Sequence, residues 1–147
     1  MANGAKGKIV VGVDGSPASA RALRWALRQA ELTGAEVEAV HAWQIPAMYG
    51  TAAMTLPGDQ LAETAENAMT EAMDAVAGEA RFKDIPVNRR LVEAHPAKAL
   101  IEESKDADLL VVGNRGHGGF VGALIGSVSQ QVVHHASCPV VVVRAEN

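Results

Sequence analysis

Four short apolar runs constrain the fold of this chain more than any other feature. Their sequences are KIVVGVD, EVEAVHAW, DLLVVG and CPVVVVR, and they end at Asp14, Trp43, Gly113 and Arg144. Nearly continuous Val, Leu and Ile without strict alternation is typical of strands that are buried on both faces. A fifth and weaker candidate is VNRRLVEA, residues Val87–Ala94. The runs therefore predict a parallel sheet that helices cover on both faces.

The segments between these runs have helical spacing. Ser16 followed by Pro17 is typical of a helix start, because serine caps free N–H groups and proline fits the first helical position. Further helices are expected over roughly Asp59–Ala80, from Pro96 and from about Gly126. The first three helices have an apolar stripe, whose members are, in turn, Ala20, Leu23, Ala26, Leu27 and Ala30; Leu61, Ala65, Ala68, Met69 and Ala72; and Ala97, Leu100 and Ile101.

Strands and helices alternate along the chain. The order β-α-β-α-β-α-β-α-β predicts right-handed crossovers and a three-layer α/β/α fold with a doubly wound parallel sheet. The 147 residues are 48% hydrophobic, which is ample for one core. No repeat or linker marks a second domain, so we expect a single α/β domain over residues 1–147.

Charge and cysteine content argue against several classes of protein. The formal net charge of −4 disfavours a general nucleic-acid-binding protein, because phosphate contacts need a basic face. No apolar run approaches the ~20 residues of a membrane span, and none precedes the first strand as a signal peptide would. Cys138 is the single cysteine, so a disulfide within the chain is impossible and a reducing compartment fits. We therefore expect a soluble, cytoplasmic protein.

Glycines are concentrated in the segment GNRGHGGFVGALIG, from Gly113 to Gly126. Such glycines can form a flexible connection or shape the main chain around a phosphate group. The segment has no third glycine in register for a dinucleotide-binding G-x-G-x-x-G, and Gly119 stands where a P-loop needs lysine. Neither of these well-known phosphate-binding motifs is therefore present.

What remains is Gly113-x-x-Gly116, followed after nine residues by Gly126-Ser127. Gly113 lets a strand end turn without a Cβ clash, and Gly116 permits a positive φ, so that successive N–H groups can converge on an anion. Gly126 and Ser127 open a helix, whose N-terminus favours phosphate. An alternative stays open, because SVSQ, Ser127–Gln130, is also a capping box that needs no ligand.

At this point the sequence resembles a known family. VVGNRGHGGFVGALIGSVSQQVVHHASCPVVVV resembles the universal stress protein family, whose nucleotide-binding members have the signature G-2X-G-9X-G-[S/T]. The similarity extends through IVVGVDGSPASARALRWAL and HPAKALIEESKDADLLVVG, and so covers essentially the whole chain. The resemblance implies a five-stranded parallel sheet of order 3-2-1-4-5 that binds ATP at the carboxyl edge of its strands.

The resemblance also implies the residues that bind ATP. They are Gly12, Val13, Asp14, Ala42, Val112, Gly113, Gly116, Gly126, Ser127, Val128 and Ser129, and this sequence's own loop adds Arg115 and His117 beside the expected phosphates. The glycine signature and the first turn of the last helix would enclose ribose and phosphates, and Ala42 would bind adenine through its main chain. Asp14 would accept hydrogen bonds from the ribose hydroxyls, although it could instead be a turn aspartate. Arg115 and His117 could contact phosphate or point to solvent.

No catalytic or metal-binding residue is predicted. His134 and His135 are adjacent and therefore diverge on a helix, while His41 and His95 are scattered. Mg²⁺ would be carried by the phosphates. Cys138 has no obvious catalytic base and is expected to be a buried structural thiol.

Two functions follow from these residues and the resemblance. The first is an ATP-binding stress protein whose nucleotide state an unidentified regulatory partner reads, and the alternative is a slow ATPase or other adenine-nucleotide hydrolase. No Asp or Glu lies between Asp108 and Glu146, which favours binding over turnover, because hydrolysis needs a group that positions water. A phospho-aspartate receiver is disfavoured, because Asp14 has no acidic neighbour and Arg144 stands where lysine is needed.

Two further segments carry expectations. In the family, the last strands of two subunits pair, so we expect a homodimer through Val140–Arg144 at an exposed sheet edge. The connection Gln44–Gly58, QIPAMYGTAAMTLPG, is unusually long and follows the carboxyl end of a strand, the edge where open α/β sheets bind ligands. It could be a lid over a pocket or a simple insertion.

Overall fold

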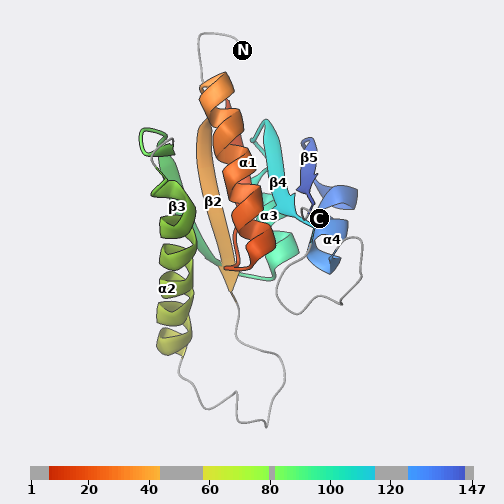
Figure 1. The fold of residues 1–147 in the computed structure, drawn as a ribbon. Coiled ribbons are helices and arrows are strands. Elements are labelled where there is room, and N and C mark those ends of the chain that lie inside the picture. Colours follow the sequence, from red (N-terminus) through yellow and green to blue (C-terminus); the bar gives the residue numbers. More distant parts are fainter. Residues whose placement is uncertain (1–6, 44–57, 80–81, 115–125, 145–147) are drawn as a thin grey trace.

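Strands and helices alternate in the computed structural model in the predicted order. The structure describes residues 7–43, 58–79, 82–114 and 126–144. The elements are β1 (Lys8–Gly12), α1 (Pro17–Thr33), β2 (Glu36–Trp43), α2 (Gly58–Ala77), β3 (Val87–Glu93), α3 (Pro96–Glu103), β4 (Leu109–Gly113), α4 (Ser127–His135) and β5 (Val140–Val143). The five strands form one parallel sheet of order β3-β2-β1-β4-β5 (Figure 1). The predicted sheet and its strand order are therefore confirmed.

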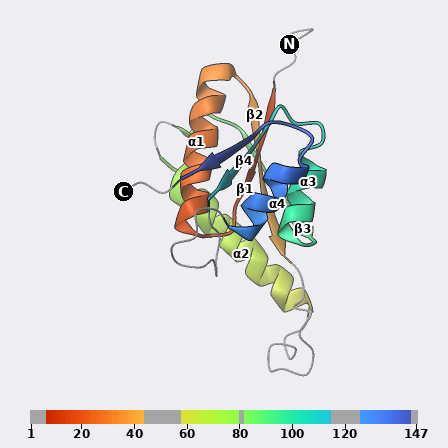
Figure 2. The same ribbon diagram turned by 90° about the vertical axis from the view of Figure 1, so that its right-hand side faces the viewer.

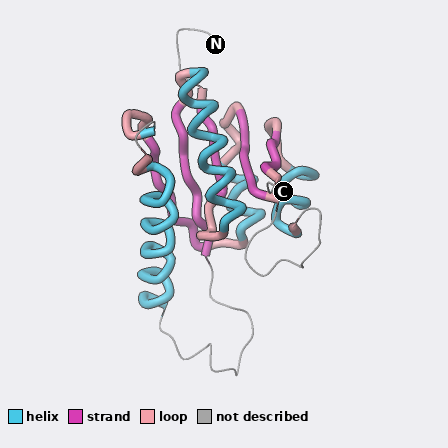
Figure 3. Tube along the Cα trace, viewed as in Figure 1, coloured by secondary structure: helices cyan, strands magenta, loops and turns pink. Residues whose placement is uncertain are grey.

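Helices cover both faces of the sheet. α1 and α2 lie on one face, where Leu23, Leu27 and Met73 are fully buried. α3 and α4 lie on the other face, where Leu100 and Val132 are buried. Figure 2 shows the sheet between α1 on one side and α3 and α4 on the other, and Figure 3 shows the same elements coloured by type. The predicted three-layer arrangement is confirmed.

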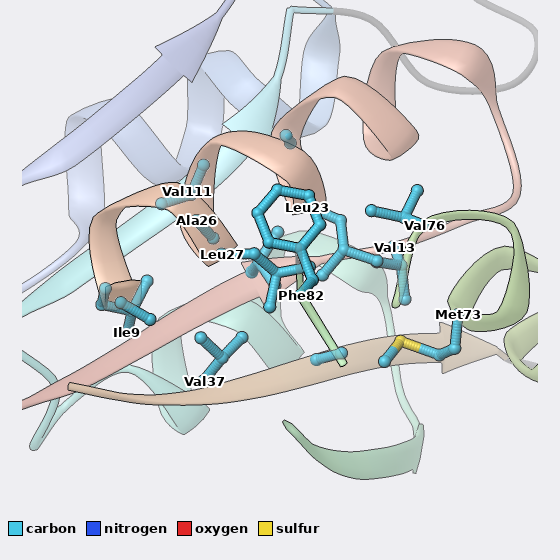
Figure 4. Close-up of a cluster of buried hydrophobic side chains, with 14 of the residues drawn as sticks. Ile9, Val13, Leu23, Ala26, Leu27, Val37, Met73, Val76, Phe82 and Val111 are labelled. Atoms are coloured by element: carbon cyan, nitrogen blue, oxygen red, sulfur yellow. The ribbon is translucent and has the colours of Figure 1, made fainter. Parts of the chain in front are cut away.

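The central strand β1 sends its side chains into two apolar cores. Ile9 and Val11 belong to the core under α1 and α2, whereas Val10 belongs to the core under α3 and α4. Figure 4 shows Leu27 of α1 and Phe82 together in the first of these cores. Because both faces of β1 are buried in apolar surroundings, its sequence has no polar alternation.

The sequence of β3 has only a weak apolar pattern because this strand lies at one edge of the sheet. Most of its side chains are exposed, from Asn88 through Leu91 and again at Glu93. Exposed positions need no apolar residue, so the strand had only a faint sequence pattern. Ala94, the last residue of the predicted strand, lies just beyond β3, but its N–H still donates to the carbonyl of Trp43 at 2.9 Å.

α1 begins as predicted and buries a slightly different stripe. The Ser16 hydroxyl caps the helix by accepting from the N–H of Ser19 at 3.1 Å, and Gly34 ends it in the left-handed region at φ +79°. The expected stripe is confirmed at four positions, but Ala20 is only partly buried, while Ala22 is fully buried. The buried and the expected faces of α1 therefore differ at its N-terminal end and agree over the rest of the helix.

The other helices agree with their predicted positions. In α2, Met69 is buried as expected and Met73 and Val76 continue its stripe, whereas the side chains of Leu61 and Ala65 lie outside the described ones. In α3, Ala97 and Leu100 are buried and Ile101 packs beside them as a partly buried side chain. Among the helices of the described ranges, none is long and apolar enough to span a membrane.

Candidate functional site

β1 and β4 are paired neighbours that end at the carboxyl edge of the sheet, and α1 begins a few residues after the end of β1. The last residue of β4, Gly113, approaches the first turn of α1 so closely that a Cβ there would lie 2.7 Å from the carbonyl oxygen of Ala18. The nearest atoms are the carbonyl group and the Cβ of Ala18, and none of them can rotate away. Gly113 is thus required for a close approach of two elements, which adds a packing reason to the turn that the sequence suggested.

Three hydrogen bonds join the ends of β4 and β5 to the start of α4. The buried Ser129 hydroxyl donates to the carbonyl of Gly113. The N–H of Gly126 donates to the carbonyl of Asn114 at 2.5 Å, and the N–H of Asn114 donates to the carbonyl of Val143 at 2.9 Å. The chain therefore leaves β4 and enters α4 at one junction. Because the Ser129 hydroxyl donates within the protein, any hydroxyl contact to a ligand would have to use its oxygen as an acceptor.

The start of α4 corrects one of the two interpretations of SVSQ. Gly126 is the N-cap residue, and its carbonyl accepts the first helical bond from the N–H of Gln130 at 2.9 Å. Ser127 is then the first helical residue, so the capping-box interpretation, which needs the serine at the N-cap, is wrong. The N–H groups of Ser127, Val128 and Ser129 have no carbonyl partner within the helix. Together with the exposed Ser127 hydroxyl they form an end that favours an anion.

Asp14 follows β1 and is held in a turn. Its Oδ1 accepts from the N–H of Ser16 at 2.9 Å, and its own N–H donates to Oγ of Ser19 at 3.2 Å. Between them Gly15 has φ +84°, a left-handed conformation that favours glycine. The interpretation of Asp14 as a turn aspartate is confirmed. It does not conflict with ligand binding, because a carboxylate can accept several hydrogen bonds.

The other residues expected at the ends of β1 and β2 lie along the same edge. Val13 is buried, and its N–H donates to the carbonyl of Val40 at 2.9 Å. Gly12 is paired with Val40, so Ala42 extends beyond the end of β1. A Cβ on Gly12 would lie 2.9 Å from Cδ1 of Leu100, so this glycine leaves room for a side chain of α3.

Of the remaining residues expected at the site, two are described by the structure and three are not. Val112 is buried in the core under α3 and α4, so only its main chain could contact a ligand. The side chain of Val128 is partly buried against the same core. Arg115, Gly116 and His117 lie outside the described residues, and the predictions for them stay predictions.

Two residues at this edge were not singled out from the sequence. Asn114 is 7% exposed, and its Oδ1 has no hydrogen-bond partner in the described part of the chain. A buried acceptor without a donor is costly unless a ligand or water supplies one, and it lies directly after Gly113. His41 contacts the carbonyl of Val13 through Nδ1 at 2.8 Å. In the sequence, only its position one residue before Ala42 indicates that His41 lies near the expected site.

The described residues offer no protein site for a metal ion. They contain no group of three or more His, Cys, Asp or Glu side chains that could hold one. Cys138 is partly buried, and burial raises the pKa of its thiol, so it is less reactive than an exposed thiol at neutral pH.

Comparison with known proteins gives one consistent result. The family model described as universal stress protein family matches residues 6–144. A universal stress protein of Mycobacterium tuberculosis strain H37Rv is 39% identical over 137 residues, which are 92% of this chain and 45% of that protein. A universal stress protein of Mycolicibacterium smegmatis is 39% identical over 141 residues, with the same coverage. The chain thus spans about half the length of the curated relatives it matches.

Solved structures agree in fold. The universal stress protein UspA from Lactobacillus plantarum has a TM-score of 0.74 at 26% identity, over 97% of this chain and 100% of that one. A universal stress protein in complex with cAMP has a TM-score of 0.69 at 30% identity, over 95% and 98% of the two chains. The universal stress protein from Archaeoglobus fulgidus in complex with dAMP has a TM-score of 0.67 at 25% identity, over 92% and 95%.

Proposed function

Because this chain belongs to the universal stress protein family, we propose that it binds an adenine nucleotide, ATP in the cell, at the carboxyl edge of its sheet. One observation carries the proposal. The N-terminus of α4, with three N–H groups that have no helical partner and an exposed Ser127 hydroxyl, is held beside the end of β4 by the bond from Ser129 to Gly113.

The phosphates would lie at the start of α4. Aligned peptide dipoles and unpaired N–H groups give this end a partial positive charge, which favours phosphate. The Oδ1 atom of Asn114 sits at the same junction, and a hydroxyl of the ligand or a bound water would supply its missing donor. Gly116, with Arg115 and His117, would complete the phosphate contacts, and Mg²⁺ would be carried by the phosphates rather than by the protein.

The nucleoside would lie across the ends of β1 and β2. Asp14 would accept from the ribose hydroxyls, since its position after β1 is fixed by the turn through Gly15. Ala42 would bind adenine through its main chain, because it extends past the end of β1. Two similar proteins, those solved with cAMP and with dAMP, support an adenine nucleotide as the ligand class.

The cellular role follows from binding without fast turnover. We propose that the bound nucleotide sets the conformation that a regulatory protein partner reads in the cytoplasm during stress. A slow ATPase remains the alternative, and turnover near 1 s⁻¹ or faster would favour it, because that rate approaches typical enzyme values.

The experiment adds a negative charge where the phosphates would bind. Ser127→Glu changes an exposed residue in the first turn of α4. A negative side chain at a helix N-terminus interacts favourably with the helix dipole, so this variant should fold like the wild type. Ser137→Glu, at an exposed position beyond the other end of α4, is the matched control with the same change of charge. Isothermal titration with ATP and AMP should show binding at least about tenfold weaker for Ser127→Glu and unchanged for the control.

The same titrations can refute the site. If the wild-type protein binds neither nucleotide, the proposed function is wrong. If Ser127→Glu binds both nucleotides like the wild type, the phosphates do not lie at α4. Mass spectrometry of nucleotide extracted from the purified protein would identify the ligand that the cell supplies.

A further inference from the structure

His41 makes a contact just beyond the last residue of β1, at Val13, whose N–H is still bonded to the carbonyl of Val40 in β2. β1 ends at Gly12, opposite Val40, while β2 continues to Trp43. Beyond this end, Nδ1 of His41 lies 2.8 Å from the carbonyl oxygen of Val13. A carbonyl oxygen can only accept, so the imidazole has its proton on Nδ1 and donates. A side chain of β2 therefore holds the main chain that leaves β1.

The carbonyl of Val13 belongs to the same planar peptide group as the N–H of Asp14. The carbonyl end accepts from His41, and the N–H end donates to Oγ of Ser19 at 3.2 Å. These two partners lie on different elements, β2 and α1. A hydrogen bond at the carbonyl and another at the N–H fix the rotation of this peptide plane. The plane in turn sets the direction in which the side chain of Asp14 points from the main chain.

The side chain of Asp14 is held by the same turn. Its Oδ1 accepts from the N–H of Ser16 at 2.9 Å. Ser16 is the N-cap of α1 and Ser19 lies in its first turn, so both of these contacts come from the start of one helix. His41 adds a contact from a neighbouring strand and so ties the position of Asp14 to the sheet.

We infer that His41 is a positioning residue for nucleotide binding, which holds the Val13–Asp14 peptide so that the Asp14 carboxylate meets the ribose hydroxyls. The inference rests on the proposed function, in which Asp14 accepts from ribose. His41 itself does not touch the nucleotide. Its loss should therefore reduce the discrimination between a ribose that has hydroxyls and one that lacks them, whereas a purely structural role would lower stability without changing this discrimination.

The test compares AMP with 2′,3′-dideoxy-AMP as probes. Isothermal titration should show that the wild type binds AMP about tenfold more tightly, because hydrogen bonds to a carboxylate are lost with the hydroxyls. His41→Leu removes the donor and should reduce this preference to about threefold or less, and Asp14→Ala should abolish it. His134→Leu, at an exposed histidine in the last turn of α4, is the matched control and should keep the full preference.

Two amide variants separate the hydrogen bond from the loss of shape. His41→Asn places an amide nitrogen where Nδ1 stands, so it should restore most of the AMP preference. His41→Gln has the same amide one bond further from the main chain and should behave like His41→Leu. This pair keeps a polar side chain at the position, so it remains informative if the leucine variant does not fold.

Each outcome has a distinct meaning. Loss of the preference in His41→Leu and His41→Gln with recovery in His41→Asn supports the inference. If Asp14→Ala loses the preference while His41→Leu and His41→Gln retain it, the positioning role is wrong and the nucleotide site stands. If the wild type binds none of ATP, AMP and dideoxy-AMP, the proposed function fails, and the inference fails with it.

Discussion

Gly113→Ala is expected to destabilise the fold because it forces β4 away from α1. The added Cβ would lie 2.7 Å from the carbonyl oxygen of Ala18 and 2.8 Å from its carbonyl carbon and Cβ. Carbon atoms at van der Waals contact are about 3.5–4.0 Å apart, so the first turn of α1 or the end of β4 would have to move by roughly 1 Å. Because the obstructing atoms are mostly main chain, no change of rotamer relieves the contact.

The size of the effect follows from known costs of overpacking. Forcing extra volume into a packed contact typically costs about 1–3 kcal/mol, and the main-chain nature of this contact places Gly113→Ala near about 2–3 kcal/mol. For a domain of this size that corresponds to a melting temperature lower by about 6–12 °C. Differential scanning calorimetry and urea unfolding would measure both quantities.

Gly12→Ala is the matched control, because it makes the same substitution at the end of the neighbouring strand. There the Cβ would lie 2.9 Å from Cδ1 of Leu100, at the far end of a flexible side chain. Leu100 can rotate or shift, so the expected cost is about 1 kcal/mol or less. If Gly12→Ala destabilises the protein as much as Gly113→Ala, the distinction between main-chain and side-chain contact is refuted.

Three further predictions concern stability and assembly. Burial, helped by the nearby Glu103 carboxyl, raises the pKa of Glu38 above 4.5, so the folded state holds this proton more tightly than the unfolded chain does. The free energy of unfolding should therefore fall as the pH rises from about 4.5 through the folded pKa. Glu38→Gln should remove this pH dependence from melting temperatures measured over the same range. Ser129→Ala leaves the carbonyl of Gly113 without its donor and should cost about 1–2 kcal/mol in urea unfolding, whereas Ala at the exposed Ser137 should cost almost nothing. Because β5 is an edge strand, light scattering at micromolar concentration should show a homodimer through Val140–Arg144, and a stable monomer would contradict this.

Much of the fold could be predicted because its strands are buried on both faces. β1 and β4 lie between two apolar cores, so their sequences are continuous apolar runs, which are typical of strands in a covered parallel sheet. The start of α1 was also readable, since the cap and the first turn involve neighbouring residues, from Ser16 to Ser19. β3 was the least certain strand, because an edge position leaves most of its side chains in water.

The sequence by itself determined the sheet, its order through the family resemblance, and the residues of the glycine signature. Tertiary structure alone decided why Gly113 must lack a side chain, that the Ser129 hydroxyl holds the end of β4, and that His41 holds the peptide before Asp14. The physical reason is the distance along the chain. Helical and strand periodicity and caps arise between residues a few positions apart, whereas these contacts join segments that only the packed fold brings together.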